Sequence, residues 1–331
     1  MSIRTKLLPF LRDYVDRLCE AYRGESKFLA AIRILFALYV IAFPIDYTWA
    51  GEVPSVLFQP RSGPFALLSA PPSEGFLVGL EVARFVLAIA LLVGYRTMTT
   101  SIAMTVVLVT GSGIVHSFGK VDHFILFEIL PVAMAAAGWG AAWSLDARRS
   151  NSRQKKPTTH GLPMLLWAIT VAYALFTAAL PKAASGWFNP ELQATRGYVA
   201  RDVADPTKLG PLTFEIFDIH TVWLWKALDY ATVFAEGWLI IAVLFPVLFR
   251  IGILVVLGFH MGVYLAMGIE FDSYIFVYLP FLSAPIVWII GKVLGKRPAI
   301  SDPSGVENHP RQPSAEESQG LHPQPSRVAT E

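Results

Sequence analysis

The chain has 331 residues, of which 54% are hydrophobic and 16% are charged, whereas about 25% of the residues in an ordinary soluble domain are charged. The apolar residues form continuous blocks close to the roughly 20 residues that a helix needs to cross a membrane. The sequence therefore excludes a soluble globular protein and predicts an all-α, polytopic bundle of transmembrane helices. A net charge of +2 gives no indication of nucleic-acid binding. Cys19 is the only cysteine, which excludes disulfide frameworks, thiolate metal clusters and CxxC redox pairs.

The first segment, 1–27, is predicted to be an amphipathic helix that lies on the membrane surface. Its apolar residues, among them Leu7, Leu11 and Leu18, recur near helical spacing, and charged residues such as Arg12 separate them. This pattern gives one apolar and one polar face, which is typical of an interfacial helix.

Eight apolar blocks follow, and we predict that they form one transmembrane domain over 28–291 with about eight spans. The blocks are 28–44, 76–93, 98–115, 124–143, 162–180, 227–245, 248–267 and 274–290. The remaining segment, 292–331, is rich in proline, serine, glutamate and glutamine and has few large apolar residues. Such a composition buries too little surface to fold, so we expect a disordered tail.

The distribution of lysine and arginine predicts the orientation in the cell membrane. Basic residues are concentrated in 1–27, in the connection 144–161 and in 291–297. Because cytoplasmic loops are enriched in lysine and arginine, both termini are predicted to be cytoplasmic. Arg33, near the inner end of the first block, is expected to extend to the cytoplasmic surface.

Ionisable residues at membrane depth are costly and are therefore candidates for function. Most of them lie toward the outer ends of the predicted spans, where we expect an outward-opening pocket. The candidates are Asp122, His123, Glu128, Lys182, Glu236 and His260.

Each candidate also has a structural interpretation. Asp122 can cap the helix that follows it, and His260 can form a hydrogen bond between helices. Glu81 and Arg84 lie three residues apart on one helical face, so we expect them to neutralise each other.

Three stretches resemble one family. They are Lys120–Leu130 together with Trp143–Asp146, the run Ala179–Phe188, and the later positions Glu236–Trp238, Pro246–Arg250, His260, Met267–Ile269 and Asp272–Tyr274. Their order and spacing are similar to those of the vitamin K-dependent γ-carboxylases and their bacterial relatives, the HTTM (horizontally transferred transmembrane) domain proteins. The resemblance covers about residues 29–288.

The resemblance implies that Lys182 is a general base that deprotonates reduced vitamin K or another lipid-soluble quinol, with His123 supporting the reaction. It also implies that Asp122, Glu128, Glu236 and His260 belong to the substrate-binding region. A lysine at the membrane boundary loses solvation, which favours its neutral form and suits a base. The expected partners are membrane lipid and a quinol, without nucleic acid, metal or haem.

Two other classes of function stay open. The same buried acids and histidines can relay protons in a transporter or channel without enzymatic activity. A b-type haem electron carrier needs two histidines on facing helices at matching depth. Only His260 lies clearly inside a predicted span, which disfavours the haem interpretation.

Overall fold

The computed structural model describes residues 3–60, 63–119, 124–152, 158–205 and 209–283, all within one compact unit, Met1–Val287. Every regular element in these ranges is helical, as the sequence predicts. The predicted tail, 292–331, lies outside the described residues, as do two of the candidate site residues, Asp122 and His123.

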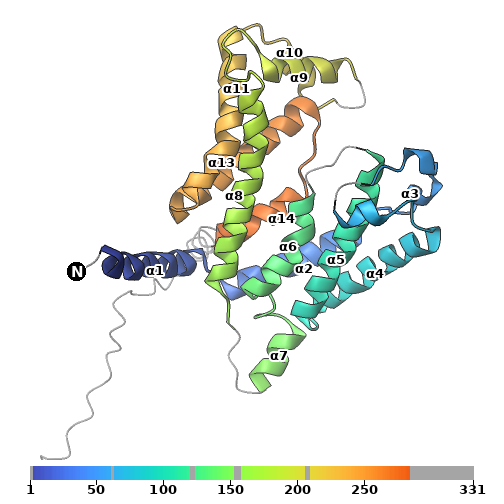
Figure 1. The fold of residues 1–331 in the computed structure, drawn as a ribbon, viewed down its shortest axis with the longest axis vertical. Coiled ribbons are helices and arrows are strands. Elements are labelled where there is room, and N and C mark those ends of the chain that lie inside the picture. The colour runs from blue at the N-terminus through green and yellow to red at the C-terminus, as the bar shows by residue number, and fades with distance from the viewer. Residues whose placement is uncertain (1–2, 61–62, 120–123, 153–157, 206–208, 284–331) are drawn as a thin grey trace, which may run out of the picture. The chain divides into compact units, whose positions relative to one another are not determined.

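Figure 1 shows the arrangement of the helices along the chain. The α-helices are α1 Ile3–Tyr22, α2 Ser26–Ala42, α3 Trp49–Glu52, α4 Glu74–Val93, α5 Thr97–Val115, α6 Ile125–Ala137, α7 Leu145–Ser152, α8 Gly161–Ala184, α9 Ala194–Val203, α10 Thr213–Phe217, α11 Val222–Gly237, α12 Leu239–Ala242, α13 Pro246–Met267 and α14 Tyr274–Tyr278. Short 3-10 helices are η1 Ser55–Leu57, η2 Pro64–Leu67, η3 His116–Phe118 and η5 Leu279–Leu282.

Four helices of the described chain are long and apolar enough to cross a membrane. They are Glu74–Val93, Thr97–Phe118, Gly161–Ala184 and Pro246–Met267. Each coincides with one of the eight predicted blocks, and each has the length that a hydrocarbon core requires. The protein therefore has the candidate spans of a multi-pass membrane protein.

The other four predicted blocks form shorter helices. The first block forms α2, which has 17 residues. The fourth block stops at Ala137, because Gly138 adopts a φ of 98° and ends α6. The sixth block is divided at Trp238 between α11 and α12, and the eighth begins with α14 and continues beyond the described residues. The expected count of about eight spans stays a prediction.

Arg33 does not extend to the cytoplasmic surface as expected, because its side chain is fully buried. The guanidinium donates hydrogen bonds to the carbonyl oxygens of Trp139, Ala142 and Trp143, at 3.0, 3.3 and 2.5 Å. These carbonyls belong to the connection between α6 and α7, which has no helical hydrogen bonds to satisfy them. The buried guanidinium of Arg33 therefore supplies donors to this connection.

Helix α1 is docked on the bundle along one side. It packs against α8 and α13. The Tyr14 hydroxyl donates to the Leu244 carbonyl and the Tyr22 hydroxyl donates to the Val243 carbonyl, both at 2.8 Å. Its other side exposes apolar side chains, namely Phe10, Leu11 and Val15. The amphipathic character predicted for this segment is present, and its position at a membrane surface stays a prediction.

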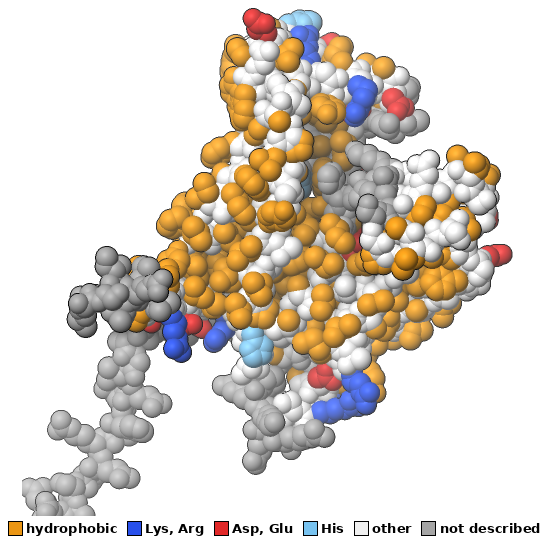
Figure 2. All heavy atoms as spheres, in the orientation of Figure 1, with side chains coloured by type: hydrophobic (Ala, Val, Ile, Leu, Met, Phe, Trp, Pro, Cys, Tyr) orange, Lys and Arg blue, Asp and Glu red, His pale blue; other side chains and the backbone are white. Residues whose placement is uncertain are grey.

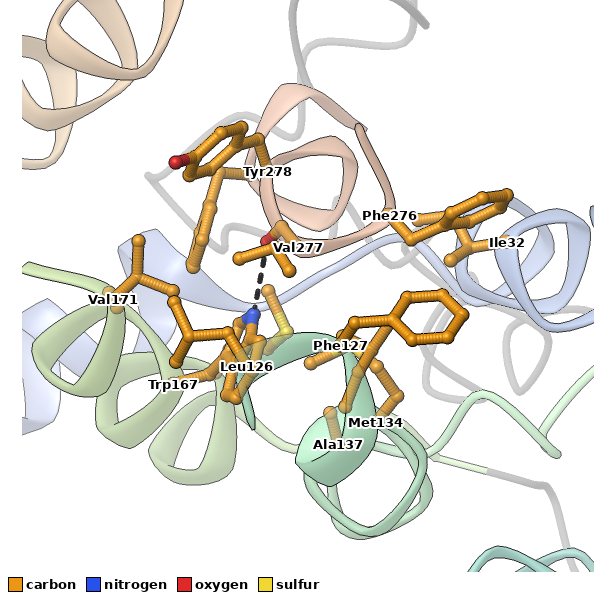
Figure 3. Packing of buried hydrophobic residues seen from close by; sticks show 14 of the residues in the cluster. Ile32, Leu126, Phe127, Met134, Ala137, Trp167, Val171, Phe276, Val277 and Tyr278 are labelled. Atoms are coloured by element: carbon orange, nitrogen blue, oxygen red, sulfur yellow. Dashed lines mark hydrogen bonds between the residues drawn. The ribbon is translucent and has the colours of Figure 1, made fainter. Parts of the chain in front are cut away.

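The main core joins α2, α6, α8 and α14, and Figure 3 shows part of it. The Trp167 indole on α8 donates to the Val277 carbonyl on α14 at 3.1 Å. Phe127 on α6 meets Phe276 on α14 with ring centroids 6.0 Å apart and Ile32 on α2 lies beside them. Elements far apart in sequence therefore share one buried centre.

Hydrophobic side chains cover the middle of the face seen in Figure 2, and most of its charged side chains lie toward the upper and lower ends. On α4, the exposed positions include Val82, Phe85, Val86 and Ile89. An apolar surface of this kind is costly in water and suits contact with lipid.

Candidate functional site

Two predicted site residues, Lys182 and Glu236, form a direct ion pair. Lys182 lies in the last turn of α8 and Glu236 near the end of α11, and these two helices pack side by side (Figure 1). The Lys182 ammonium donates to both carboxylate oxygens of Glu236, at 2.6 and 2.5 Å. The Lys182 side chain is 27% exposed and that of Glu236 is 7% exposed. The pair thus has a buried acid and a cation that is partly accessible.

The surroundings of this pair are largely apolar. The Lys182 ammonium lies 5.9 Å from the centroid of the Trp187 ring, within the range of a cation–π interaction. Trp187 is buried in a small cluster with Ala179 and Val233, which come from α8 and α11. Low polarity strengthens the attraction between the two opposite charges. It also favours neutral groups over charged ones, so it lowers the free-energy cost of transferring the proton from Lys182 to Glu236.

A second lysine–acid pair lies two to three turns earlier on α11. The Lys226 ammonium donates to the carbonyls of Trp187 and Leu192, at 2.7 and 2.9 Å, and to Asp229 at 3.0 Å. The Asp229 carboxylate accepts hydrogen bonds from the first two backbone N–H groups of α9, at 3.1 and 2.7 Å. Both side chains are buried. This pair holds the start of α9 against α11 and has a structural role.

His260 lies on α13 inside a group of aromatic rings. Its ring stacks on Phe271 with a centroid distance of 4.0 Å and an interplanar angle of 5°. The rings of Tyr274 and Tyr278 lie 5.5 and 5.8 Å away. Tyr278 in turn interacts electrostatically with Glu236.

Glu128 belongs to a different part of the molecule, a cavity of about 710 Å³ between α2, α4, α5 and α6. Arg84 and Tyr47 also line this cavity, and all three side chains are buried. The residues described as lining it do not include Lys182, Glu236 or His260. The structure therefore brings Lys182 together with Glu236, places His260 in a group of aromatic rings, and places Glu128 in a separate cavity.

The expected ion pair between Glu81 and Arg84 is replaced by bonds to the backbone. A Glu81 carboxylate oxygen accepts a hydrogen bond from the Tyr47 N–H at 2.7 Å, and the Arg84 guanidinium donates to the Val40 carbonyl at 3.0 Å. Val40 lies in the last turn of α2, where carbonyls have no intrahelical donor, and Tyr47 lies in the segment that follows, so both backbone groups are available to these side chains. Arg84 is thereby directed into the cavity.

Tyr47 was not among the residues that the sequence pointed to, because it follows an apolar block without any recognisable motif. Its ring lies against Gly111 of α5, where a β-carbon would overlap the ring atoms. A glycine inside an apolar helix is a signal for such close packing, but it does not indicate which side chain occupies the space.

No family model, curated protein or solved structure matches this chain. Among the described residues, no three histidine, cysteine, aspartate or glutamate side chains lie together in a group that could hold a metal ion. The candidate site is therefore argued from its own contacts, beginning with the Lys182–Glu236 pair.

Proposed function

We propose that the protein is a multi-pass membrane enzyme that exchanges a proton with a lipid-soluble substrate at Lys182. The observation that carries the proposal is the bidentate Lys182–Glu236 ion pair, in which the carboxylate is buried and the ammonium is 27% exposed. A buried charge in a membrane bundle is expensive unless it serves a purpose, and here the accessible partner is the one able to reach a substrate.

The proposed chemistry uses the pair as a unit. Transfer of the proton from the Lys182 ammonium to the Glu236 carboxylate leaves a neutral amine beside a carboxylic acid. The amine can then accept a proton from an acidic substrate hydroxyl, which regenerates the ammonium and leaves the substrate as an anion. Glu236 thus positions the amine and holds the proton that the amine must release before it acts as a base.

The resemblance to the γ-carboxylases and HTTM proteins supports the same lysine as the base and favours reduced vitamin K or another quinol as the substrate. In this proposal His123 assists the lysine, the domain has about eight spans, and both termini face the cytoplasm of a cell-membrane protein. The buried ring of Trp187, 5.9 Å from the Lys182 ammonium, keeps the surroundings of the amine apolar, which suits a base that acts on a lipid-soluble substrate.

One observation favours a second candidate, a membrane transporter that relays protons without enzymatic activity. Glu236 interacts electrostatically with Tyr278, whose ring lies 5.8 Å from that of His260. In this candidate, titratable groups on α8, α11, α14 and α13 carry protons from one to the next through the bundle.

Purified protein in lipid nanodiscs tests the first candidate directly. With a reduced quinone under oxygen, the wild type should accelerate quinol oxidation over empty nanodiscs, and Lys182→Met should reduce the rate to background. Lys182→Met removes the amine and keeps the length of the side chain. A wild-type rate equal to that of empty nanodiscs for several quinols would reject the proposed reaction. The second candidate, a transporter, would then be supported if wild-type protein in proteoliposomes shows a proton flux and Glu236→Gln abolishes that flux.

A further inference from the structure

The cavity beside Glu128 contains an unusual set of buried polar atoms. Within the described residues, Glu128 Oε1, Arg84 Nε and Tyr47 Oη have no hydrogen-bond partner. The exposed fraction is 4% for Glu128, 5% for Arg84 and 0% for Tyr47. A buried polar atom without a partner has lost its hydrogen bonds to water and gained none in return, which is unfavourable. Three of them in the lining of one cavity point to a ligand that supplies their partners.

We infer that this cavity binds a neutral lipid-soluble molecule whose polar head is a hydroxyl group. The three unpaired atoms comprise one acceptor, on Glu128, and two donors, on Arg84 and Tyr47. A hydroxyl oxygen offers one donated hydrogen and two acceptor lone pairs, which is the matching set. The inference concerns a site other than the Lys182–Glu236 pair, so it holds whether or not the proposed reaction is correct.

The charges around the cavity favour a neutral head over a charged one. Arg84 and Glu128 carry opposite charges and line the same cavity, so they contribute no net charge. Glu270 and Asp272 are exposed carboxylates in the lining, and they repel an anionic head such as a fatty-acid carboxylate or a phosphate. A cationic head would compete with Arg84.

The rest of the lining suits an apolar body. Most of the remaining wall is aliphatic or aromatic, and its rings belong to Tyr39, Phe43, Trp49, Phe118, Phe124 and Phe127. A volume of about 710 Å³ falls inside the range of roughly 300–1,000 Å³ found for sites that hold small organic molecules. The cavity thus combines an apolar body with a few convergent polar groups, the usual pattern of a ligand site.

Binding of dodecanol to the full-length protein in nanodiscs tests the inference, with empty nanodiscs correcting for partition into lipid. Wild-type protein should bind dodecanol saturably, whereas dodecanoate and dodecyl methyl ether should bind about tenfold more weakly. The ether keeps the chain and the acceptor but cannot donate to Glu128. Octylphenol tests whether the preferred hydroxyl is carried by an aromatic ring or by an aliphatic chain, and preference for either agrees with the site.

Two variants identify the cavity as the place of binding. Tyr47→Phe removes one hydroxyl and keeps the ring, and it should weaken dodecanol binding about tenfold. Glu128→Leu should remove the preference for dodecanol over its ether. Tyr22→Phe is the matched control, because Tyr22 is a buried tyrosine outside the cavity and its hydroxyl already donates to the Val243 carbonyl at 2.8 Å, so binding should stay within about twofold. If Glu128→Leu fails to fold, the comparison of Tyr47→Phe with Tyr22→Phe decides alone.

Three results would overturn the inference. They are the absence of saturable dodecanol binding above empty nanodiscs, equal affinity of the alcohol and the ether for wild-type protein, and unchanged dodecanol binding in Tyr47→Phe. The first would mean that the cavity holds only water. Because none of these measurements uses turnover, loss of quinol oxidation in Lys182→Met does not affect them.

Discussion

Helix α11 carries two lysine–acid pairs that look alike in composition and differ in their surroundings. Lys226 and Asp229 are both buried, and their hydrogen bonds tie α11 to the chain around α9. In the other pair, Glu236 is buried while Lys182 is 27% exposed. Within the described chain, the Lys182 ammonium donates to the two carboxylate oxygens of Glu236, which leaves one of its three N–H groups to donate elsewhere.

The difference separates a structural ion pair from one that can react. A lysine whose three donors are used by two carbonyls and a carboxylate cannot release its proton without losing several contacts at once. A lysine held by a single carboxylate can exchange its proton with that partner. Burial of charge in a membrane protein is therefore not by itself evidence of catalysis, and the number and type of hydrogen-bond partners is the better criterion.

The largest effect on stability is expected for Lys226→Met. The substitution leaves the buried Asp229 without its cation and two carbonyls without their donor, which should cost about 3–5 kcal/mol of unfolding free energy. Unfolding in mixed micelles with increasing denaturing detergent measures this cost. Lys182→Met is the matched control and should cost less, because it leaves only the carboxylate of Glu236 without its donor, whereas Lys226→Met also leaves two carbonyls without theirs. Equal destabilisation by the two substitutions would contradict the distinction between the pairs.

A smaller loss is expected for Asp229→Asn. The amide oxygen can still accept one of the two N–H groups of α9, but the amide group no longer neutralises Lys226. The loss of charge-assisted hydrogen bonds should cost roughly 1.5–3 kcal/mol. Hydrogen exchange of the α9 backbone should show where the loss acts, with faster exchange at Ala194 and Thr195. Unchanged exchange there would mean that Asp229 does not hold the start of α9.

The sequence predicts the helical membrane class and the positions of the four long helices because apolar length directly reflects the thickness of a membrane. It does not predict the interruptions at Gly138 and Trp238, because apolar composition continues through both positions. It also misplaces Arg33, since the carbonyls that bind it lie more than a hundred residues later. Patterns within one helix cannot reveal partners supplied by another.

The candidate site shows the same limit. Lys182, Glu236, His260 and Glu128 are recognisable from the cost of placing ionisable groups in a membrane. That cost applies to each residue separately, so it does not indicate which of them meet. The pairing of Lys182 with Glu236 and the separate cavity around Glu128 follow from helix packing, and the latter depends on Tyr47 and Arg84, for which the sequence gives no functional signal.

A still smaller effect on stability is expected for Glu236→Gln. The amide keeps the shape of the side chain and can accept one hydrogen bond from Lys182, whose partly exposed ammonium can turn toward water or the membrane interface. The cost should be about 1 kcal/mol or less, measured by the same unfolding titration. Turnover should fall by far more than stability, because no acceptor remains for the lysine proton. A loss of stability as large as that of Lys226→Met would show that the second pair is also structural.

The smallest effect on stability, and the most informative for mechanism, is expected for Lys182→Arg. The guanidinium keeps a positive charge beside Glu236, so the unfolding free energy should change by no more than about 0.5 kcal/mol. An arginine stays protonated at any accessible pH and cannot act as a base, so turnover on a quinol that the wild type oxidises should be lost. Lys226→Arg is the matched control and should retain turnover per folded molecule. Its stability should fall more than that of Lys182→Arg, because Lys226 is buried and has little room for the larger guanidinium. Wild-type turnover in Lys182→Arg would show that the lysine serves only as a fixed charge, and the proposed proton exchange at Lys182 would be wrong.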